Sequence, residues 1–345
     1  MTTTISSIIG LLARPPRVVA VATIVLLIIA GSAGARAQGV RSGSVLVANQ
    51  RSENASLIDL RTDSMRFIAV GVGPHEAIVS PTGRVGVVTV YGLQSPPGNE
   101  LAIIDMKAGT VTKTISLGEY VRPHGAMFMP RDESRVLVTS EATQKVVLVN
   151  LANGQIEAVI PTGATGSHMV GVTADGTRAW TSNIFAGSVS ELDLVKKELV
   201  RVIPTGPRTE GIAVAPDGST VWAGSNTNGT VTVIDARTGN TIETLGGFSL
   251  PYRLAISADG KTAIVCDPQA NAIHVVDVAT RKVLWKLDGL ASPRGVVIAA
   301  DGRTAYVTLA EDPAVGIVDL VARKLVRKVG VGASPDGVGV GPFPH

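Results

Sequence analysis

The chain has 345 residues, with 31 Lys and Arg against 28 Asp and Glu, so its formal net charge is only +3. Aromatic residues make up 3% of the chain, and it has a single cysteine. This composition argues against a nucleic-acid-binding surface, which needs clustered cations and stacking platforms, and it excludes an intramolecular disulfide.

Residues 1–37 have the pattern of a signal peptide. Arg14 and Arg17 form a basic region, Val18 to Ala30 is an apolar run, and Ala35-Arg36-Ala37 offers a small-x-small cleavage site. The apolar run is shorter than the ~20 residues that span a bilayer. We predict cleavage after Ala37 and a periplasmic or secreted protein, with an uncleaved membrane anchor as the alternative. The remaining chain would carry 28 basic and 28 acidic residues, because all three lost charges are arginines.

A repeat begins after this segment and is clearest in residues 206–247, which hold four short runs rich in Val, Ile and Thr. Polar breaks with Asp-Gly and Asn-Gly separate the runs, as in strands joined by tight turns. Four strands in about 42 residues make one propeller blade. The second run and its turn recur as IVSPTG, VTADG, AVAPDG, AISADG and VIAADG from residues 78, 172, 213, 255 and 297, at spacings of 41 or 42 residues after one double interval between the first two.

The units predict how the ring closes. Residues 43–70 hold only three strands, and the C-terminal SPDGVGVGP matches the missing opening strand. Complete units follow at 71–118, 119–163, 164–206, 207–247, 248–289 and 290–332. We therefore predict an all-β, seven-bladed β-propeller with four-stranded antiparallel blades as a single domain over residues 38–345. Its C-terminal strand would join the N-terminal blade and leave no free sheet edge.

Three smaller features complete this interpretation. No sustained 3.6-residue periodicity occurs, so no helix is expected. Tyr91 to Glu100, with Pro96-Pro97-Gly98, predicts a loop that is longer than its counterparts and lies beside the channel. Cys266, in the apolar run TAIVC, is expected to be a small buried hydrophobe.

The repeat resembles the YVTN-type seven-bladed β-propeller family, whose name-giving strand appears here as Tyr306-Val307-Thr308-Leu309. The resemblance extends over residues 43 to 341. It implies the fold but no particular activity, because propellers of this build include binding proteins as well as metal-dependent lyases and lactonases.

In a propeller the first strand of each blade lines the central channel, so the residues that enter these strands should meet at one mouth. At this position the repeats have seven polar residues: His75, His124, His168, Glu210, Arg253, Arg294 and Asp336. Three imidazoles and a carboxylate are ligands for Zn, Cu or Fe, and three protein ligands leave a coordination position open. The two arginines could hold an anion by bidentate hydrogen bonds.

Two alternatives stand beside the metal site. The mouth could bind a small anion without metal. It could also be a charge-balanced structural ring, in which Arg253 pairs with Glu210 and Arg294 with Asp336. Five loop residues are expected on the same face, either in the site or in turns: Asn49, Glu141, Asn183, Asn226 and Asp267. The Asp that ends most third strands is expected to accept hydrogen bonds from its turn.

The function that these observations favour is a monomeric, non-catalytic binding or scaffold protein. It would bind a small anionic molecule, or an envelope or redox protein, at the channel mouth. Its cofactor, if the mouth is a metal site, would be one divalent transition metal held by His75, His124, His168 and Glu210, with Arg253, Arg294, Glu141 and Asn183 contacting the ligand. The alternative is a metal-dependent lyase, hydrolase or lactonase in which Glu210 or Asp336 moves protons.

Overall fold

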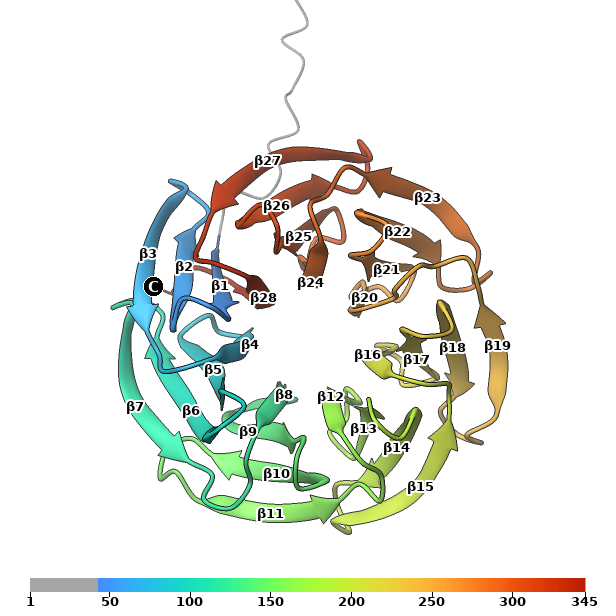
Figure 1. Cartoon of the computed structure of the whole chain (residues 1–345), viewed down its shortest axis with the longest axis horizontal. Coiled ribbons are helices and arrows are strands. Elements are labelled where there is room, and N and C mark those ends of the chain that lie inside the picture. Colours follow the sequence, from blue (N-terminus) through green and yellow to red (C-terminus); the bar gives the residue numbers. More distant parts are fainter. Residues whose placement is uncertain (1–42, 345) are drawn as a thin grey trace, which may run out of the picture. The chain divides into compact units, whose positions relative to one another are not determined.

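The structure is a computed structural model that describes residues 43–344. These residues form 28 strands in seven four-stranded antiparallel sheets, arranged as blades around a central axis (Figure 1). The predicted fold class is confirmed. No helix within the described range is long and apolar enough to cross a membrane. The predicted signal peptide lies outside the described residues.

Each blade runs outward from a first strand at the channel. Blade 1 contains β28 (Pro335–Gly341), β1 (Ser44–Asn49), β2 (Asn54–Asp59) and β3 (Ser64–Ala69), and blade 2 contains β4 (Pro74–Val79), β5 (Val85–Gly92), β6 (Pro97–Asp105) and β7 (Thr110–Ser116). Blade 3 contains β8 (Pro123–Met129), β9 (Asp132–Ser140), β10 (Lys145–Asn150) and β11 (Ile156–Pro161), and blade 4 contains β12 (Ser167–Val172), β13 (Arg178–Asn183), β14 (Ser188–Asp193) and β15 (Glu198–Pro204). Blade 5 contains β16 (Thr209–Val214), β17 (Thr220–Ser225), β18 (Thr230–Asp235) and β19 (Thr241–Leu245), and blade 6 contains β20 (Leu254–Ile256), β21 (Thr262–Asp267), β22 (Ala272–Asp277) and β23 (Val283–Asp288). Blade 7 contains β24 (Pro293–Ile298), β25 (Thr304–Leu309), β26 (Ala314–Asp319) and β27 (Lys324–Gly330).

The ring closes as predicted, through strands from both ends of the described chain. β28 pairs antiparallel with β1, with Val340 opposite Val45 and Val338 opposite Val47. The first blade is therefore completed by the last strand, and backbone hydrogen bonds replace what would be an exposed edge.

The hydrophobic core lies between neighbouring blades. One cluster joins Val87 and Leu101 of blade 2 to Val136 and Val147 of blade 3, and six similar clusters fill the other interfaces of the described ring. Second strands are buried on both faces, whereas outer strands such as β15 alternate between exposed residues and half-buried or buried ones. Each blade thus depends on its neighbours to cover both faces. Cys266 is fully buried, as expected.

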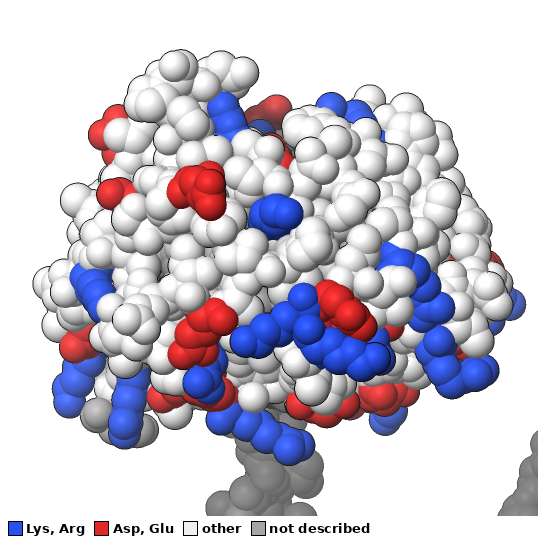
Figure 2. Space-filling model, turned by 90° about the horizontal axis from the view of Figure 1, so that it is seen from below, with Lys and Arg blue, Asp and Glu red and all other residues white. Residues whose placement is uncertain are grey.

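Polar side chains also link each blade to the next near the outer rim. Arg201 illustrates the contact, since its guanidinium donates to the carbonyls of Ala236 and Arg237 in the following blade. The other six links join Arg66 to Ala108, Lys113 to Ala152, Lys197 to Glu157, Arg281 to Glu243, Arg323 to Trp285 and Arg327 to Asp63. Figure 2 views the molecule after a 90° turn from Figure 1, and charged side chains of both signs gather on the lower half of the face that it shows.

The turns account for the acidic residue that ends most third strands. Asp105, for example, accepts hydrogen bonds from the backbone N–H groups of Lys107 and Ala108, both at 2.9 Å. Equivalent bonds are made by Asp59, Asn150, Asp193, Asp235, Asp277 and Asp319. Their role is therefore the structural one that the repeat predicted.

The segment from Tyr91 to Glu100 differs from the predicted loop. β5 and β6 extend through most of it as a longer hairpin, with Val90 opposite Glu100 and Gly92 opposite Pro97. Pairing satisfies backbone groups that a loop would leave to water, so this hairpin holds Tyr91 firmly beside the channel.

Candidate functional site

The seven polar residues predicted at the channel mouth all lie at the start of a first strand, and the backbone explains why. Arg253 directly precedes β20, and the others are the second residue of their strands. Two positions earlier the chain has a positive φ in six of the seven blades, at Gly73, Arg122, Gly166, Arg208, Ser292 and Ser334. This left-handed residue bends the chain from the outer strand of one blade into the first strand of the next.

A hydroxyl on the second strand fixes these positions relative to one another. Thr89 accepts the backbone N–H of Glu76 at 2.9 Å and donates to the carbonyl of His124 in the next blade at 3.1 Å. Thr139, Ser182 and Thr308 make the same two bonds toward His168, Glu210 and Asp336. Thr308 is the threonine of the YVTN-like strand, so that motif residue holds neighbouring first strands in register.

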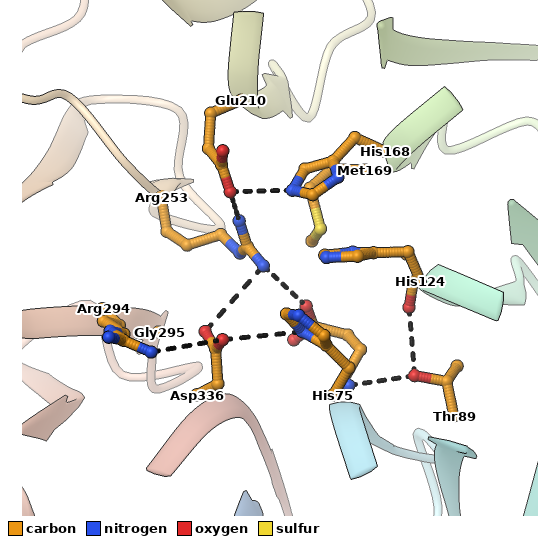
Figure 3. Close-up of polar contacts among 12 residues, drawn as sticks. His75, Thr89, His124, His168, Met169, Glu210, Arg253, Arg294, Gly295 and Asp336 are labelled. Carbon is orange, nitrogen blue, oxygen red and sulfur yellow. Dashed lines mark hydrogen bonds and ion pairs between the residues drawn. The ribbon is translucent and has the colours of Figure 1, made fainter. Parts of the chain in front are cut away.

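Arg253 is the centre of the ion pairs at the channel mouth (Figure 3). The residue is only 4% exposed. Its Nη1 is 2.8 Å from Glu210 Oε1, and its Nη2 is 3.4 Å from Glu76 Oε2 and 3.9 Å from Asp336 Oδ1. The guanidinium of Arg253 therefore forms ion pairs with three carboxylates across the channel. Arg294 adds a longer contact, 3.8 Å from Asp336 Oδ2.

His168 is held on both sides by carboxylates. Its Nδ1 is 2.6 Å from Glu141 Oε2 and its Nε2 is 2.7 Å from Glu210 Oε1. Burial would lower the pKa of His168, but the charge of Glu210 and the hydrogen bond to Glu141 outweigh it and raise the pKa to about 9. Conversely, burial would raise the pKa of Glu210, but His168 and Arg253 lower it to about 2. At neutral pH His168 is therefore an imidazolium that lies between the carboxylates of Glu141 and Glu210.

Glu76 is a site residue that the sequence reasoning missed. Burial raises the pKa of its carboxyl group to about 7, against the opposing charge of Arg253. The sequence signal was present, because four of the seven repeats have glycine one residue after the mouth position and blade 2 has Glu76. Gly337 makes room for it, since a Cβ there would lie 2.3 Å from Glu76 Oε1.

His124 lies between the other two imidazoles. Its ring centroid is 4.0 Å from that of His75 and 3.6 Å from that of His168. It is fully buried, and neither of its ring nitrogens has a hydrogen-bond partner among the described residues. Burial and the neighbouring His168 hold its pKa well below the ordinary range, so the ring is neutral. This ring offers a free lone pair in a dry environment.

Within residues 43–344, the side-chain geometry defines one group of residues able to share a metal ion. Ligand atoms of His124, Glu141 and His168 all lie within 4.8 Å of one another. His75 and Glu210, which the sequence placed in the same ligand set, lie outside this group. His75 instead faces Asp336 at 3.5 Å and Gln50 at 3.1 Å.

The five loop residues expected near the mouth divide into two kinds. Glu141 contacts His168, and Asn226 donates to Glu210 Oε2 at 3.2 Å, so both belong to the site. Asn183 donates to Ser188 and Ser190 within its own blade. Asn49 and Asp267 likewise hold nearby turns and loops.

A cavity of 350 Å³ opens above the cluster and is lined by the three imidazoles, Glu141, Glu210, Asn226, Tyr91 and Tyr252, among others. Tyr91 donates its hydroxyl to Glu141 Oε1 at 2.7 Å and stacks edge-on to His75 with a centroid distance of 5.0 Å. The longer β5–β6 hairpin therefore supplies one wall of the cavity, next to His75 and His124.

No family model and no curated protein sequence matches this chain. Among solved structures, 1720 chains match, and one of them is titled Kuenenia stuttgartiensis hydrazine synthase. That chain superposes with a TM-score of 0.72 at 18% identity, over 80% of this chain and 92% of the other. At this identity the likeness shows the fold alone. Fold and comparisons together define the protein as a seven-bladed β-propeller with a buried charged cluster at one channel mouth.

Proposed function

We propose that this chain is an exported binding protein of the YVTN type that holds one divalent transition metal ion at the channel mouth. His124, His168 and Glu141 would be its ligands. The observation that carries the proposal is His124, a fully buried neutral imidazole with no partner for either nitrogen, next to two further ligand side chains. Buried polar atoms without partners are costly, and a bound ion would give a partner to one of the two His124 nitrogens.

The chemistry of the donor set fits such an ion. Two imidazoles and one carboxylate suit Zn²⁺ or a neighbouring transition metal, and they leave a coordination position open toward the cavity. His168 would bind through Nδ1, while Nε2 keeps its hydrogen bond to Glu210 at 2.7 Å. A carboxylate on the far nitrogen of a ligating histidine fixes ring orientation and raises its basicity.

The 2.6 Å contact between His168 Nδ1 and Glu141 Oε2 is a hydrogen bond. Two atoms that are each ~2.0–2.2 Å from one ion in tetrahedral geometry lie further apart than this. Binding therefore requires a small separation of these two side chains and the loss of the proton between them.

The other two hypotheses have weaker support. An anion clamp by Arg253 and Arg294 needs free guanidinium groups. Arg253 is surrounded by Glu210, Glu76 and Asp336. Arg294 also lies near a carboxylate, 3.8 Å from Asp336. An enzyme that uses Glu210 to move protons needs a pKa near neutrality, and the pKa of Glu210 is about 2. We therefore propose metal binding as the function and assign no proton-transfer role to Glu210.

We expect wild-type protein, loaded with Zn²⁺ and desalted, to retain one ion per chain by elemental analysis. His124→Asn, His168→Asn and Glu141→Gln should each weaken Zn²⁺ binding at least about 100-fold, because removal of a ligand costs more than removal of its hydrogen-bond partner. The matched control is His75→Asn, which alters a neighbouring imidazole outside the group and should leave the affinity almost unchanged.

A wild-type protein that retains no Zn²⁺ contradicts the proposal. Equal losses in His75→Asn and His124→Asn would point instead to the three-imidazole site that the sequence suggested.

Zn²⁺ binding at pH 7 is expected to release about one proton per chain, from His168, because its pKa of about 9 keeps it protonated before binding. His124 contributes none, since its lowered pKa leaves it neutral. The affinity should thus rise about tenfold per pH unit up to pH 9 and then level off. Calorimetry in buffers of different ionisation enthalpy measures the released proton, and binding without proton release would refute the assigned role of His168.

A further inference from the structure

A second cavity adjoins the one above the proposed metal site. It has a volume of 520 Å³ and lies between blades 4 and 5, and Ile184, Phe185 and Arg208 line both cavities. The outer cavity is otherwise lined by small residues and prolines, including Pro204 and Pro207. Both volumes fall in the range of small-molecule sites.

The inner cavity gathers aromatic side chains from a chain that has few of them. The whole sequence has only 4 tyrosines and 5 phenylalanines, yet Tyr91, Tyr252 and Phe185 all line this cavity. Phe185 is 66% exposed at the junction with the outer cavity. An aromatic ring held out of the core at the entrance of a pocket is suited to contact a flat apolar group of a ligand.

Arg208 supplies a positive charge at the same junction. It is exposed, and no carboxylate of the described chain lies within ion-pairing distance of it. Arg253, by contrast, is buried and its two terminal nitrogens face Glu210 and Glu76. Arg208 is therefore the cation available to an anionic ligand that enters the pocket.

We infer that this two-part pocket binds a small planar aromatic carboxylate. This inference rests on the proposed metal site. The carboxylate would occupy the coordination position open toward the inner cavity and pair with Arg208, while the aromatic ring lies against Phe185 and extends into the outer cavity. The combination of a metal ligand, one free guanidinium and an exposed aromatic ring selects for this class of anion over small aliphatic acids.

Isothermal titration of Zn²⁺-loaded protein with sodium benzoate, cyclohexanecarboxylate and acetate tests the inference. Benzoate should bind about tenfold more tightly than acetate, with cyclohexanecarboxylate between them, because a flat ring adds stacking to apolar burial. Phe185→Ala should weaken benzoate binding about fivefold and leave acetate binding unchanged. Arg208→Gln should weaken the binding of all three acids. Phe67→Ala is the matched control, since Phe67 is 55% exposed on the outer strand β3.

Each result has one meaning. Zn²⁺ content should be the same in all variants, because none of the altered residues belongs to the ligand group. Zn²⁺-loaded protein that binds benzoate and acetate equally, or a Phe185→Ala variant with wild-type benzoate affinity, overturns this inference alone. A wild-type protein that binds no Zn²⁺ overturns the proposed metal site and this inference together.

Discussion

Replacing Glu210 with alanine is expected to lower the free energy of unfolding by about 3–5 kcal/mol, because it leaves two buried cations without their shared counter-charge. Glu210 Oε1 lies 2.7 Å from His168 Nε2 and 2.8 Å from Arg253 Nη1, and all three side chains are almost fully buried. Urea denaturation measures the change. Glu210→Gln, which keeps the shape and part of the hydrogen bonding, should lie between wild type and Glu210→Ala.

The control for this experiment is Glu243→Ala, which removes an exposed partner of Arg281 near the outer rim. Exposed ion pairs contribute little, so this variant should be close to wild type. A Glu210→Ala protein as stable as Glu243→Ala would show that the buried cluster does not depend on this carboxylate.

The ion pair between His168 and Glu210 predicts how the stability of the fold depends on pH. His168 has a pKa raised from 6.5 to about 9, so its contribution is fully present below pH 6.5 and is lost as the pH rises through 9. Glu210 has a pKa lowered from 4.5 to about 2, so its contribution is present above pH 4.5 and is lost as the pH falls through 2. The cluster should stabilise the fold most between pH 4.5 and 6.5, and Glu210→Ala should flatten the decline on the alkaline side.

Deleting residues 332–345 is expected to destroy the cooperative fold, a loss of at least about 5 kcal/mol from a total that is typically 5–15 kcal/mol. The deletion removes β28, exposes the edge of β1 and takes Val338 and Asp336 from the channel wall. An uncovered inner edge also invites pairing between chains, so we expect aggregation as well as unfolding.

A synthetic peptide that contains residues 332–345 should restore part of the folded signal when it is added to the shortened chain, because it can pair with β1. A chain shortened by its last two residues is the control and should unfold like wild type. If the long deletion retains a sharp thermal transition at the wild-type temperature, ring closure by β28 does not carry the stability assigned to it.

The repeat determined the fold because its signals are local. Short Val, Ile and Thr runs, turn pairs such as Asp217-Gly218 and a period near one blade require only neighbouring residues to be interpreted. The closing strand was predictable for the same reason, since its pattern matches the run at residue 292. The positions of the seven mouth residues followed from the period alone.

The YVTN relationship, the export signal and the partners stay predictions, since they rest on the sequence alone.

Only the tertiary structure decided which of these residues act together. Equivalent repeat positions predicted three matching imidazoles, but His75 turns to Asp336 while His168 is held by Glu141 and Glu210. Arg253 contacts Glu76, which is 177 residues away in the sequence. The repeat period does not predict this contact. The reason is physical. Strands are set by backbone pairing and local turns, whereas a site at the axis depends on side-chain rotamers and on charges that meet across the channel only after the ring has closed.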